Sequence, residues 1–239
     1  WSRWNKIICR KIFRDNWELY IRRLIAFILI ITFVLNSTAH SEEIEEGLLT
    51  TDYYLSYDLV NEEIMFTNNA DELISPASLT KLMTALLIVD SYNLGDFIEI
   101  NFPEEYVYEG KVAYLESGQQ MTVESLLEFI LIYSANDACI AASMIVSGDV
   151  DKFINLMNNK AVKLGMNNTN FNNPDGLDAD NHFTSLNDLL ILSKEVLRNI
   201  ELLTIIMKPS FISDIEGNDK VYLNTNKLIE KNYLGLKTG

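Results

Sequence analysis

The chain has short β-like segments near both ends and long helical patterns in its middle. Residues 51–58 and 64–67 are rich in β-formers and flank a turn at Asn61 and Glu62, which predicts a hairpin. Apolar residues then recur at three-to-four spacing, which predicts amphipathic helices. These helices are expected over 77–92, 122–133, 136–147, 149–164 and 185–199. Strands are expected again over 210–215, 220–224 and 233–238.

This order of elements predicts an α/β fold of the α+β type. Strands at both ends around a helical middle favour one antiparallel sheet built from both chain ends, with an inserted helical lobe. The chain stops at Gly239, in the last predicted strand. Because a half-built sheet edge is unfavourable, we expect the domain of residues 40–239 to be truncated at its C-terminal end.

Residues 1–39 are expected to form a leader with a signal peptide. A twelve-residue run at 24–35, apolar except for one threonine, follows Arg22 and Arg23. Small residues then lead to a cleavage position after Ala39, as is typical of a secretory signal. A retained membrane anchor is the alternative, but twelve residues rise only about 18 Å as a helix, less than the ~30 Å hydrocarbon core. Either reading predicts export to the periplasm or the outer face of the cytoplasmic membrane.

Charge and composition exclude several classes of protein. The net charge is −15, and the 200 residues after the leader carry 12 Lys or Arg against 32 Asp or Glu. Nucleic-acid binding is therefore not expected, because neutralising phosphates requires clustered basic residues. His40 and His182 are the only histidines, so a histidine-rich zinc site is not expected either. Cys139 is the only cysteine beyond the leader, which excludes an internal disulfide there and favours a core position.

A serine and a lysine stand three residues apart at the start of the first predicted helix. Ser78 and Lys81 share a helix face, so the hydroxyl and the amine can meet. With Ser75 as N-cap and Pro76 at the first helical position, Ser78 lies in the first turn, where the helix dipole favours negative charge. Apolar residues follow, and burial favours a neutral amine that can accept the serine proton. The alternative is a capped core helix whose lysine extends to solvent.

Two further motifs strengthen the catalytic interpretation. Lys237, Thr238 and Gly239 form the only Lys-Thr-Gly in the chain, on the last predicted strand. They offer a cation, a hydroxyl and room for a substrate to approach the backbone. Ser134 and Asn136 form a Ser-x-Asn motif in a loop between two predicted helices, where a polar pair can face a cleft.

In this order, the three motifs resemble those of the penicillin-recognising serine enzymes. The chain is most similar to the low-molecular-mass D-alanyl-D-alanine carboxypeptidases, a family of penicillin-binding serine peptidases related to β-lactamases. The resemblance covers roughly residues 50–239 and implies a β-lactamase/DD-peptidase-like fold. It extends to the segments 76–84, 133–138, 171–177, 182–185, 226–228 and 235–239.

The resemblance implies removal of the terminal D-alanine from peptidoglycan stem peptides. Ser78 would attack the carbonyl and form an acyl-enzyme, with Lys81 as general base. Ser134 would relay a proton to the departing nitrogen. Asn136 would bind the substrate backbone and orient Lys81.

The remaining implied roles concern substrate binding. Lys237 would repel a charge on Lys81 and, together with Thr238 and the adjoining Gly239, would form the site for the terminal carboxylate. β-Lactams would acylate Ser78. No metal or other cofactor is expected. Membrane association is expected only through an uncleaved leader or a C-terminal anchor beyond the sequence.

Two alternatives and one departure stay open at this point. A class A β-lactamase would need a deacylating glutamate, and the only comparable element is 195–199, which has an arginine where the motif has leucine. A non-catalytic penicillin-binding or cell-wall module is the other alternative. In the family, the residue after Lys-Thr-Gly supplies one oxyanion-hole amide, so we expect the chain as given to be inactive. His182 is expected to form hydrogen bonds within a loop rather than to act in catalysis.

Overall fold

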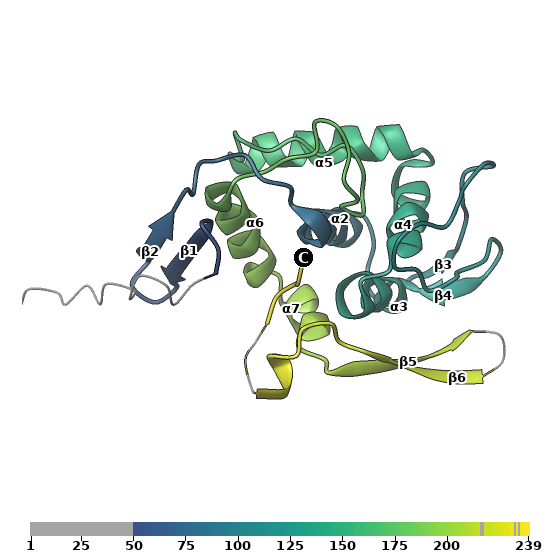
Figure 1. Ribbon diagram of the computed structural model, residues 1–239. Helices are drawn as coiled ribbons and strands as arrows, with labels where there is room; N and C mark the ends of the chain where they lie inside the picture. The colour runs from purple at the N-terminus through teal and green to yellow at the C-terminus, as the bar shows by residue number, and fades with distance from the viewer. Residues whose placement is uncertain (1–49, 216–217, 232, 234) are drawn as a thin grey trace, which may run out of the picture. The chain divides into compact units, whose positions relative to one another are not determined.

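The computed structural model of the protein describes residues 50–239 except 216–217, 232 and 234 (Figure 1). Leu49–Gly239 form one compact unit. The predicted leader, its cleavage position and its membrane-anchor alternative all lie outside the described residues. Within the described residues, every helix is too short or too polar to span a bilayer.

Helices contain more of the described residues than strands do. The helices are η1 (Ala77–Leu79), α2 (Thr80–Val89), α3 (Val123–Glu128), η2 (Phe129–Tyr133), α4 (Asn136–Ser147), α5 (Val150–Leu164), α6 (Leu186–Arg198), α7 (Ile200–Ile206) and η3 (Ile229–Lys231). The strands are β1 (Tyr54–Asp58), β2 (Glu63–Asn68), β3 (Phe97–Glu99), β4 (Gln120–Thr122), β5 (Ser210–Ile215) and β6 (Asn218–Leu223).

Helix α2 is the centre of the core. It contacts α4, α5, α6 and η2, and Figure 1 shows it between α4, α5 and α6. Nine of its ten residues are buried, among them Leu82, Met83 and Ile88. Burying each such side chain contributes about 1.5–3 kcal/mol. The start of α2, which carries Lys81, is therefore held by the best-packed part of the molecule.

Side-chain caps explain where several helices begin. The side chains of Thr122, Asp149, Ser185 and Asn199 each accept a hydrogen bond from a backbone N–H in the first turn that follows. Such a cap is worth about 1 kcal/mol because it satisfies an otherwise unpaired donor. The predicted helices over 77–92, 136–147, 149–164 and 185–199 are confirmed to within a few residues at each end.

The predicted helix over 122–133 consists of two parts. Helix α3 gives way to a π-helical turn, η2, over Phe129–Tyr133. This turn ends at Ser134, which has the left-handed backbone conformation with φ 68°. Four of the five η2 residues are buried, so packing holds the wide turn in place. π-Turns of this kind are frequent at functional sites.

The described residues do not form the single sheet that the sequence predicts from the two chain ends. They form three separate two-stranded antiparallel sheets, β1 with β2, β3 with β4 and β5 with β6. The described residues of the segment 233–238 do not form the strand that the sequence predicts. The N–H of Tyr233 closes a turn onto the oxygen of Leu228, and Gly235 has φ 72°, which is not an extended conformation.

Four short elements, β3, β4, α7 and the three-residue η3, were not predicted. β3 and β4 are three residues each, too short to show a two-residue period. Helix α7 follows α6 with only Asn199 between them, so the two helices merge in the hydrophobic pattern. The hairpin of β1 and β2 and the strands β5 and β6 lie where the sequence predicts them.

Candidate active site

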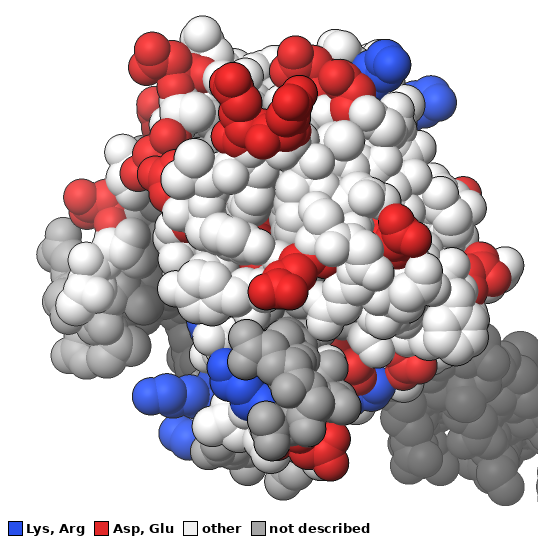
Figure 2. Space-filling model, turned by 90° about the vertical axis from the view of Figure 1, so that its right-hand side faces the viewer, with Lys and Arg blue, Asp and Glu red and all other residues white. Residues whose placement is uncertain are grey.

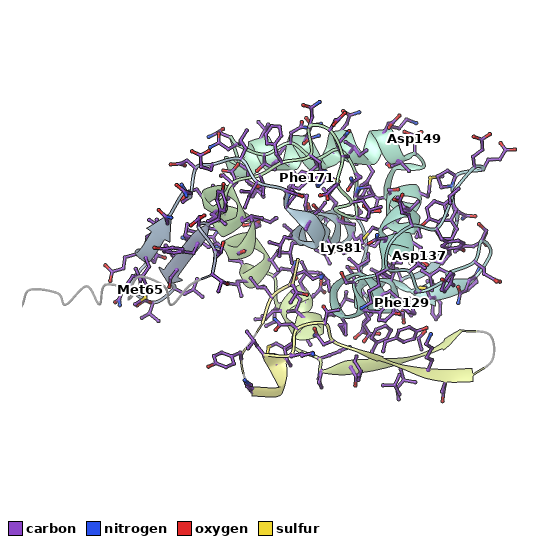
Figure 3. All side chains as sticks on the ribbon, in the orientation of Figure 1. Met65, Lys81, Phe129, Asp137, Asp149 and Phe171 are labelled. Carbon is purple, nitrogen blue, oxygen red and sulfur yellow. The ribbon has the colours of Figure 1, made fainter. Side chains whose placement is uncertain are left out.

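Ser78 and Lys81 form a hydrogen-bonded pair at the start of α2. The Nζ atom of Lys81 donates to Ser78 Oγ at 3.1 Å and to Asn136 Oδ1 at 2.8 Å. It also donates to the backbone oxygen of Asp175. Lys81 is completely buried, and Figure 3 shows it at the centre of the ribbon. An amine and a hydroxyl at this distance have the geometry of a general base and its nucleophile.

The backbone before the pair differs from the prediction in one respect. Ser75 does not cap the helix, because its hydroxyl donates to Asp178 Oδ1 at 2.9 Å. Pro76 takes the capping position of η1, and the next residue, Ala77, has a left-handed φ of 46°. Ser78 therefore projects from a tight turn that leads directly into α2.

The turn at residues 173–176, which lies far along the sequence from Ala77, packs against this strained segment. A Cβ added at Gly176 would lie 1.9 Å from the oxygen of Ala77, and Gly176 has φ 89°. Only glycine fits this close approach. Thr84 of α2 anchors the same turn by donating to the oxygen of Pro174 at 2.5 Å. The turn predicted at residues 173–176 thus forms one wall of the site.

Ser134 lies beside the nucleophile. Its hydroxyl is 3.3 Å from Ser78 Oγ, and the residue is buried. Its left-handed φ of 68° is uncommon for a residue other than glycine, and such strain is concentrated at functional sites. The position at the end of η2 thus brings the hydroxyl to within reach of Ser78.

Asn136 opens helix α4 and is oriented from several sides. Its Nδ2 donates to the oxygen of Glu109 at 3.0 Å, and its backbone N–H donates to the oxygen of Lys111 at 2.7 Å. These bonds turn Oδ1 toward Lys81. The structure therefore gathers Ser78, Lys81, Ser134 and Asn136 into one hydrogen-bonded group, although they come from two distant parts of the sequence.

The Lys-Thr-Gly segment lies against the nucleophile turn, and Figure 1 shows the chain end beside α2. A Cβ added at Gly239 would be 3.6 Å from the Cβ of Ala77. Lys237 is buried and its Nζ donates to the oxygen of Thr238 at 2.8 Å. The Thr238 hydroxyl is exposed and bonds to Thr225 Oγ1 at 3.1 Å.

Positive charges are concentrated around these groups. Burial first, and the nearby charge of Lys81 second, lower the pKa of Lys237 to about 7. Burial and the charge of Lys81 also lower the pKa of Lys111. Each of these ammonium groups disfavours the charged form of its neighbours. The pKa values of Lys111 and Lys237 are thus both lowered by burial first and by a neighbouring lysine second.

Comparison with known proteins decides the family. The sequence profile described as D-alanyl-D-alanine carboxypeptidase matches residues 39–239. The chain belongs to this family.

Relatives in the carboxypeptidase family share both sequence and fold. D-alanyl-D-alanine carboxypeptidase DacF of Bacillus subtilis (strain 168) is 36% identical over 185 residues, which are 74% of this chain and 47% of that protein. Penicillin binding protein 6B from Escherichia coli superposes with a TM-score of 0.69 at 27% identity, covering 84% of this chain and 68% of that one.

A second solved structure is penicillin-binding protein D2 from Listeria monocytogenes in its cefotaxime-bound form. Its TM-score is 0.68 at 29% identity, and the match covers 80% of this chain and 79% of that one. These likenesses confirm the DD-peptidase and β-lactamase-like fold. The chain spans about half the length of the curated relatives that it matches first.

Asp137 is a positioning residue of this carboxypeptidase-family site that the motif search missed. Its buried carboxylate accepts hydrogen bonds from the N–H groups of Ala113, at 3.0 and 3.1 Å, and Leu115, at 2.9 Å. Figure 3 labels it on α4. It ties the segment that carries Lys111 to the helix that carries Asn136. The sequence shows only an acidic residue amid apolar ones at a helix start, which does not reveal these contacts.

His182 has a structural role, as expected. Its Nδ1 accepts from the backbone N–H of Asn172 at 2.9 Å, so the ring proton is on Nε2, which donates to Thr80 Oγ1 at 2.9 Å. Burial lowers the pKa of this imidazole. The described residues contain no group of three or more His, Cys, Asp or Glu placed to hold a metal ion.

The segment over residues 195–199, which resembles the β-lactamase motif, has its described contacts away from Ser78 and Lys81. Glu195 lies in helix α6 and pairs with Arg198 at 3.3 Å. Among the described residues, the hydrogen-bond partners of Ser78 and Lys81 do not include this carboxylate. No observation therefore favours a deacylating role for Glu195.

Proposed function

We propose that the protein is a serine-type D-Ala-D-Ala carboxypeptidase that removes the terminal D-alanine from peptidoglycan stem peptides. The observation that carries the proposal is the placement of Ser78 Oγ between Lys81 Nζ, at 3.1 Å, and Ser134 Oγ, at 3.3 Å. One group is positioned to accept the serine proton and the other to pass a proton on. Membership in the carboxypeptidase family supports the same reaction.

Acylation uses both neighbours of the nucleophile. The neutral amine of Lys81 takes the hydroxyl proton while Ser78 Oγ attacks the carbonyl carbon of the penultimate D-alanine. The tetrahedral intermediate then collapses, the peptide C–N bond breaks, and the departing nitrogen receives a proton through the Ser134 hydroxyl. The products are an ester on Ser78 and free D-alanine.

Deacylation reverses the proton path. Lys81 accepts a proton from water, the resulting hydroxide attacks the ester, and Ser78 Oγ leaves and recovers its proton. The hydrogen bonds from Lys81 to Asn136 and to the oxygen of Asp175 hold the amine in position for both steps. Positioning of this kind supplies a large part of an enzyme's rate enhancement.

The other residues of the candidate site are assigned to substrate binding. Lys237 and the exposed hydroxyl of Thr238 take the terminal carboxylate, and Asn136 bonds to the peptide backbone on the acyl side. A charge-assisted bond from an ammonium to a carboxylate is about twice as strong as a neutral one. Exopeptidase specificity for a free C-terminus follows from this arrangement.

The proposal includes β-lactams as acylating inhibitors and an exported location. The Listeria monocytogenes relative was solved with cefotaxime bound, which supports acylation of Ser78 by such compounds here. The predicted leader supports export to the periplasm or the outer face of the cytoplasmic membrane. Neither a metal nor a nucleic-acid partner enters this mechanism.

The test is D-alanine release from a diacetylated stem-peptide mimic by the full-length natural protein. Ser78→Ala should abolish release and fluorescent-penicillin labelling with an unchanged circular-dichroism spectrum. Ser91→Ala is the matched control, because Ser91 follows the end of the same helix and its hydroxyl bonds to the oxygen of Leu87. Turnover that survives in Ser78→Ala would refute the proposal. Fast nitrocefin hydrolysis would favour a β-lactamase instead.

The expectation that residues 1–239 alone are inactive stays a prediction. Fluorescent-penicillin labelling of this chain beside the full-length natural protein tests it. Equal labelling of Ser78 in the two preparations would contradict it.

A further inference from the structure

Lys111 borders the site, but the mechanism above makes no use of its side chain. Its Nζ lies 4.1 Å from the centre of the Tyr133 ring, and Tyr133 directly precedes Ser134. Its backbone oxygen accepts the N–H of Asn136 at 2.7 Å. The residue is thus attached to the Ser134 and Asn136 side of the site, whereas Lys237 comes from the chain end.

The ammonium of Lys111 is held by a rigid support. The ring of Tyr133 packs edge-to-face against the ring of Tyr222, with centroids 4.9 Å apart. Tyr222 is only 1% exposed and stacks in turn on Phe211. An ammonium over the face of such a fixed ring is restrained in position by a cation–π interaction. Lys111 therefore presents its charge at a defined place, unlike a freely rotating surface lysine.

No acidic side chain neutralises this charge within the described part of the chain, where the ion pairs involve Lys160, Lys208 and Arg198 instead. Lys111 is exposed, so its ammonium is open to a ligand. Its charge contributes to lowering the pKa of Lys237, which places the two groups within electrostatic range of each other.

The surrounding surface makes this cluster of lysines distinctive. The body of the protein is strongly acidic. Figure 2 shows acidic side chains spread over one face and basic ones only toward its margins. An anionic substrate is repelled by most of this surface, and positive potential is found where Lys111 and Lys237 lie within electrostatic range of each other. Such a local potential favours a ligand with negative charge.

A peptide with one carboxylate would leave Lys111 without a partner. In the proposed mechanism the terminal carboxylate binds Lys237 and Thr238, while Asn136 bonds to the backbone on the acyl side. The backbone oxygen of Lys111 accepts a hydrogen bond from the N–H of Asn136, so Lys111 lies on the acyl side as well. We propose that Lys111 binds a carboxylate on the side chain of the residue that precedes D-Ala-D-Ala. This inference rests on the proposed function and makes the enzyme selective for stem peptides that are acidic at that position.

The experiment compares two isosteric substrates on the full-length natural protein, N-acetyl-L-glutamyl-D-Ala-D-Ala and N-acetyl-L-glutaminyl-D-Ala-D-Ala. We expect kcat/KM for D-alanine release to be about fivefold higher for the glutamyl peptide. An exposed ion pair contributes up to about 1 kcal/mol, which corresponds to a ratio of about five. In Lys111→Gln the two peptides should become equal, mainly through a higher KM for the glutamyl peptide. The preference of the unmodified protein should also shrink with added salt.

The control variant is Lys163→Gln, in an exposed lysine at the end of α5, which should keep the preference. Labelling of Ser78 by fluorescent penicillin separates the two proposals. If labelling is normal but the unmodified protein shows no preference, or Lys111→Gln retains it, the role of Lys111 is refuted and the proposed function stands. If the unmodified protein neither labels nor releases D-alanine, the proposed function fails and this inference fails with it.

Discussion

At the scale of single residues, the site depends on a few side chains whose environments alter ordinary chemistry. Lys81 is fully buried with three oxygen atoms around its Nζ, and Lys237 is buried near it. Burial without an anionic partner disfavours the ammonium form of Lys237. Its protonation therefore changes near neutral pH, and the carboxylate binding proposed for Lys237 should change with it.

We predict that KM for the stem-peptide mimic rises above pH 7. Only the protonated ammonium attracts the terminal carboxylate, and the pKa of Lys237 is about 7, so binding weakens as pH increases through that value. In Lys237→Arg the guanidinium stays charged, and the rise in KM should disappear. Steady-state kinetics from pH 5.5 to 9 measures this. A break near pH 7 that persists in Lys237→Arg would assign it to another group.

At the scale of elements, loops are fixed to the helices that carry the site. Asp137 connects α4 to the segment around Lys111, and Gly176 allows the turn at 173–176 to touch the nucleophile turn. Neither residue contacts the reacting atoms. Their substitution should therefore reveal how strongly catalysis depends on the placement of these loops.

Asp137→Ala is predicted to lower both stability and turnover. It leaves the buried N–H groups of Ala113 and Leu115 without an acceptor, at about 1–3 kcal/mol each. We expect the free energy of unfolding, measured with urea, to fall by about 2–5 kcal/mol. Asp137→Asn keeps one acceptor oxygen, so its free energy of unfolding should fall less than that of Asp137→Ala. The control Asp219→Ala removes an exposed carboxylate and should change stability by less than about 0.5 kcal/mol.

Gly176→Ala is predicted to slow acylation of Ser78 by penicillin. The added Cβ would lie 1.9 Å from the oxygen of Ala77 and would push the nucleophile turn away. Gly165→Ala is a matched control, since Gly165 has a similar φ of 86° but nothing within 4 Å of the added Cβ. Both variants should lose about 1–2 kcal/mol to backbone strain. Only Gly176→Ala should also reduce the rate of fluorescent-penicillin labelling, and equal rates would argue against the clash.

At the scale of the whole described unit, contacts between distant segments assemble the site. His182 lies 102 positions after Thr80 and joins its loop to the start of α2. The hydrogen bond that its Nδ1 accepts from Asn172 requires a neutral ring. Protonation would break this link, so the fold itself should respond to acid.

We predict that His182 makes stability fall on acidification. Burial lowers its pKa in the folded state, so the unfolded chain binds the proton first, below about pH 6.5. The contribution of His182 is complete above that pH and is lost as pH falls through the folded-state pKa. In urea unfolding at pH 7 and pH 5, His182→Gln should lose less stability between the two values than the unmodified protein. An equal loss in both would contradict this role.

The sequence predicted the parts of this unit that depend on local information. The helices follow from apolar periodicity and caps, and the Ser-x-x-Lys, Ser-x-Asn and Lys-Thr-Gly motifs led to groups that do lie together. The first hairpin was predicted correctly, but the single sheet built from both chain ends was mispredicted because it depends on which distant segments meet. The residue at 233 closes a turn rather than joining a ladder.

Within the site, the contributions of Asp137 and Lys111 could not be read from the sequence. The carboxylate of Asp137 binds backbone groups more than twenty positions away. The position of Lys111 depends on the Tyr133 ring, which in turn depends on Tyr222. Such contacts are set by tertiary packing and leave no periodic or spaced signature.

The wide turn η2 sets the direction in which Ser134 points. A π-helical turn contains one residue more than an α-helical turn, so it shifts all that follows by about 100° around the helix axis. Deleting one residue from Phe129–Tyr133 would restore regular winding and would rotate the Ser134 hydroxyl away from Ser78. The proposed proton route to the leaving group thus depends on the number of residues in η2 as well as on the identity of Ser134.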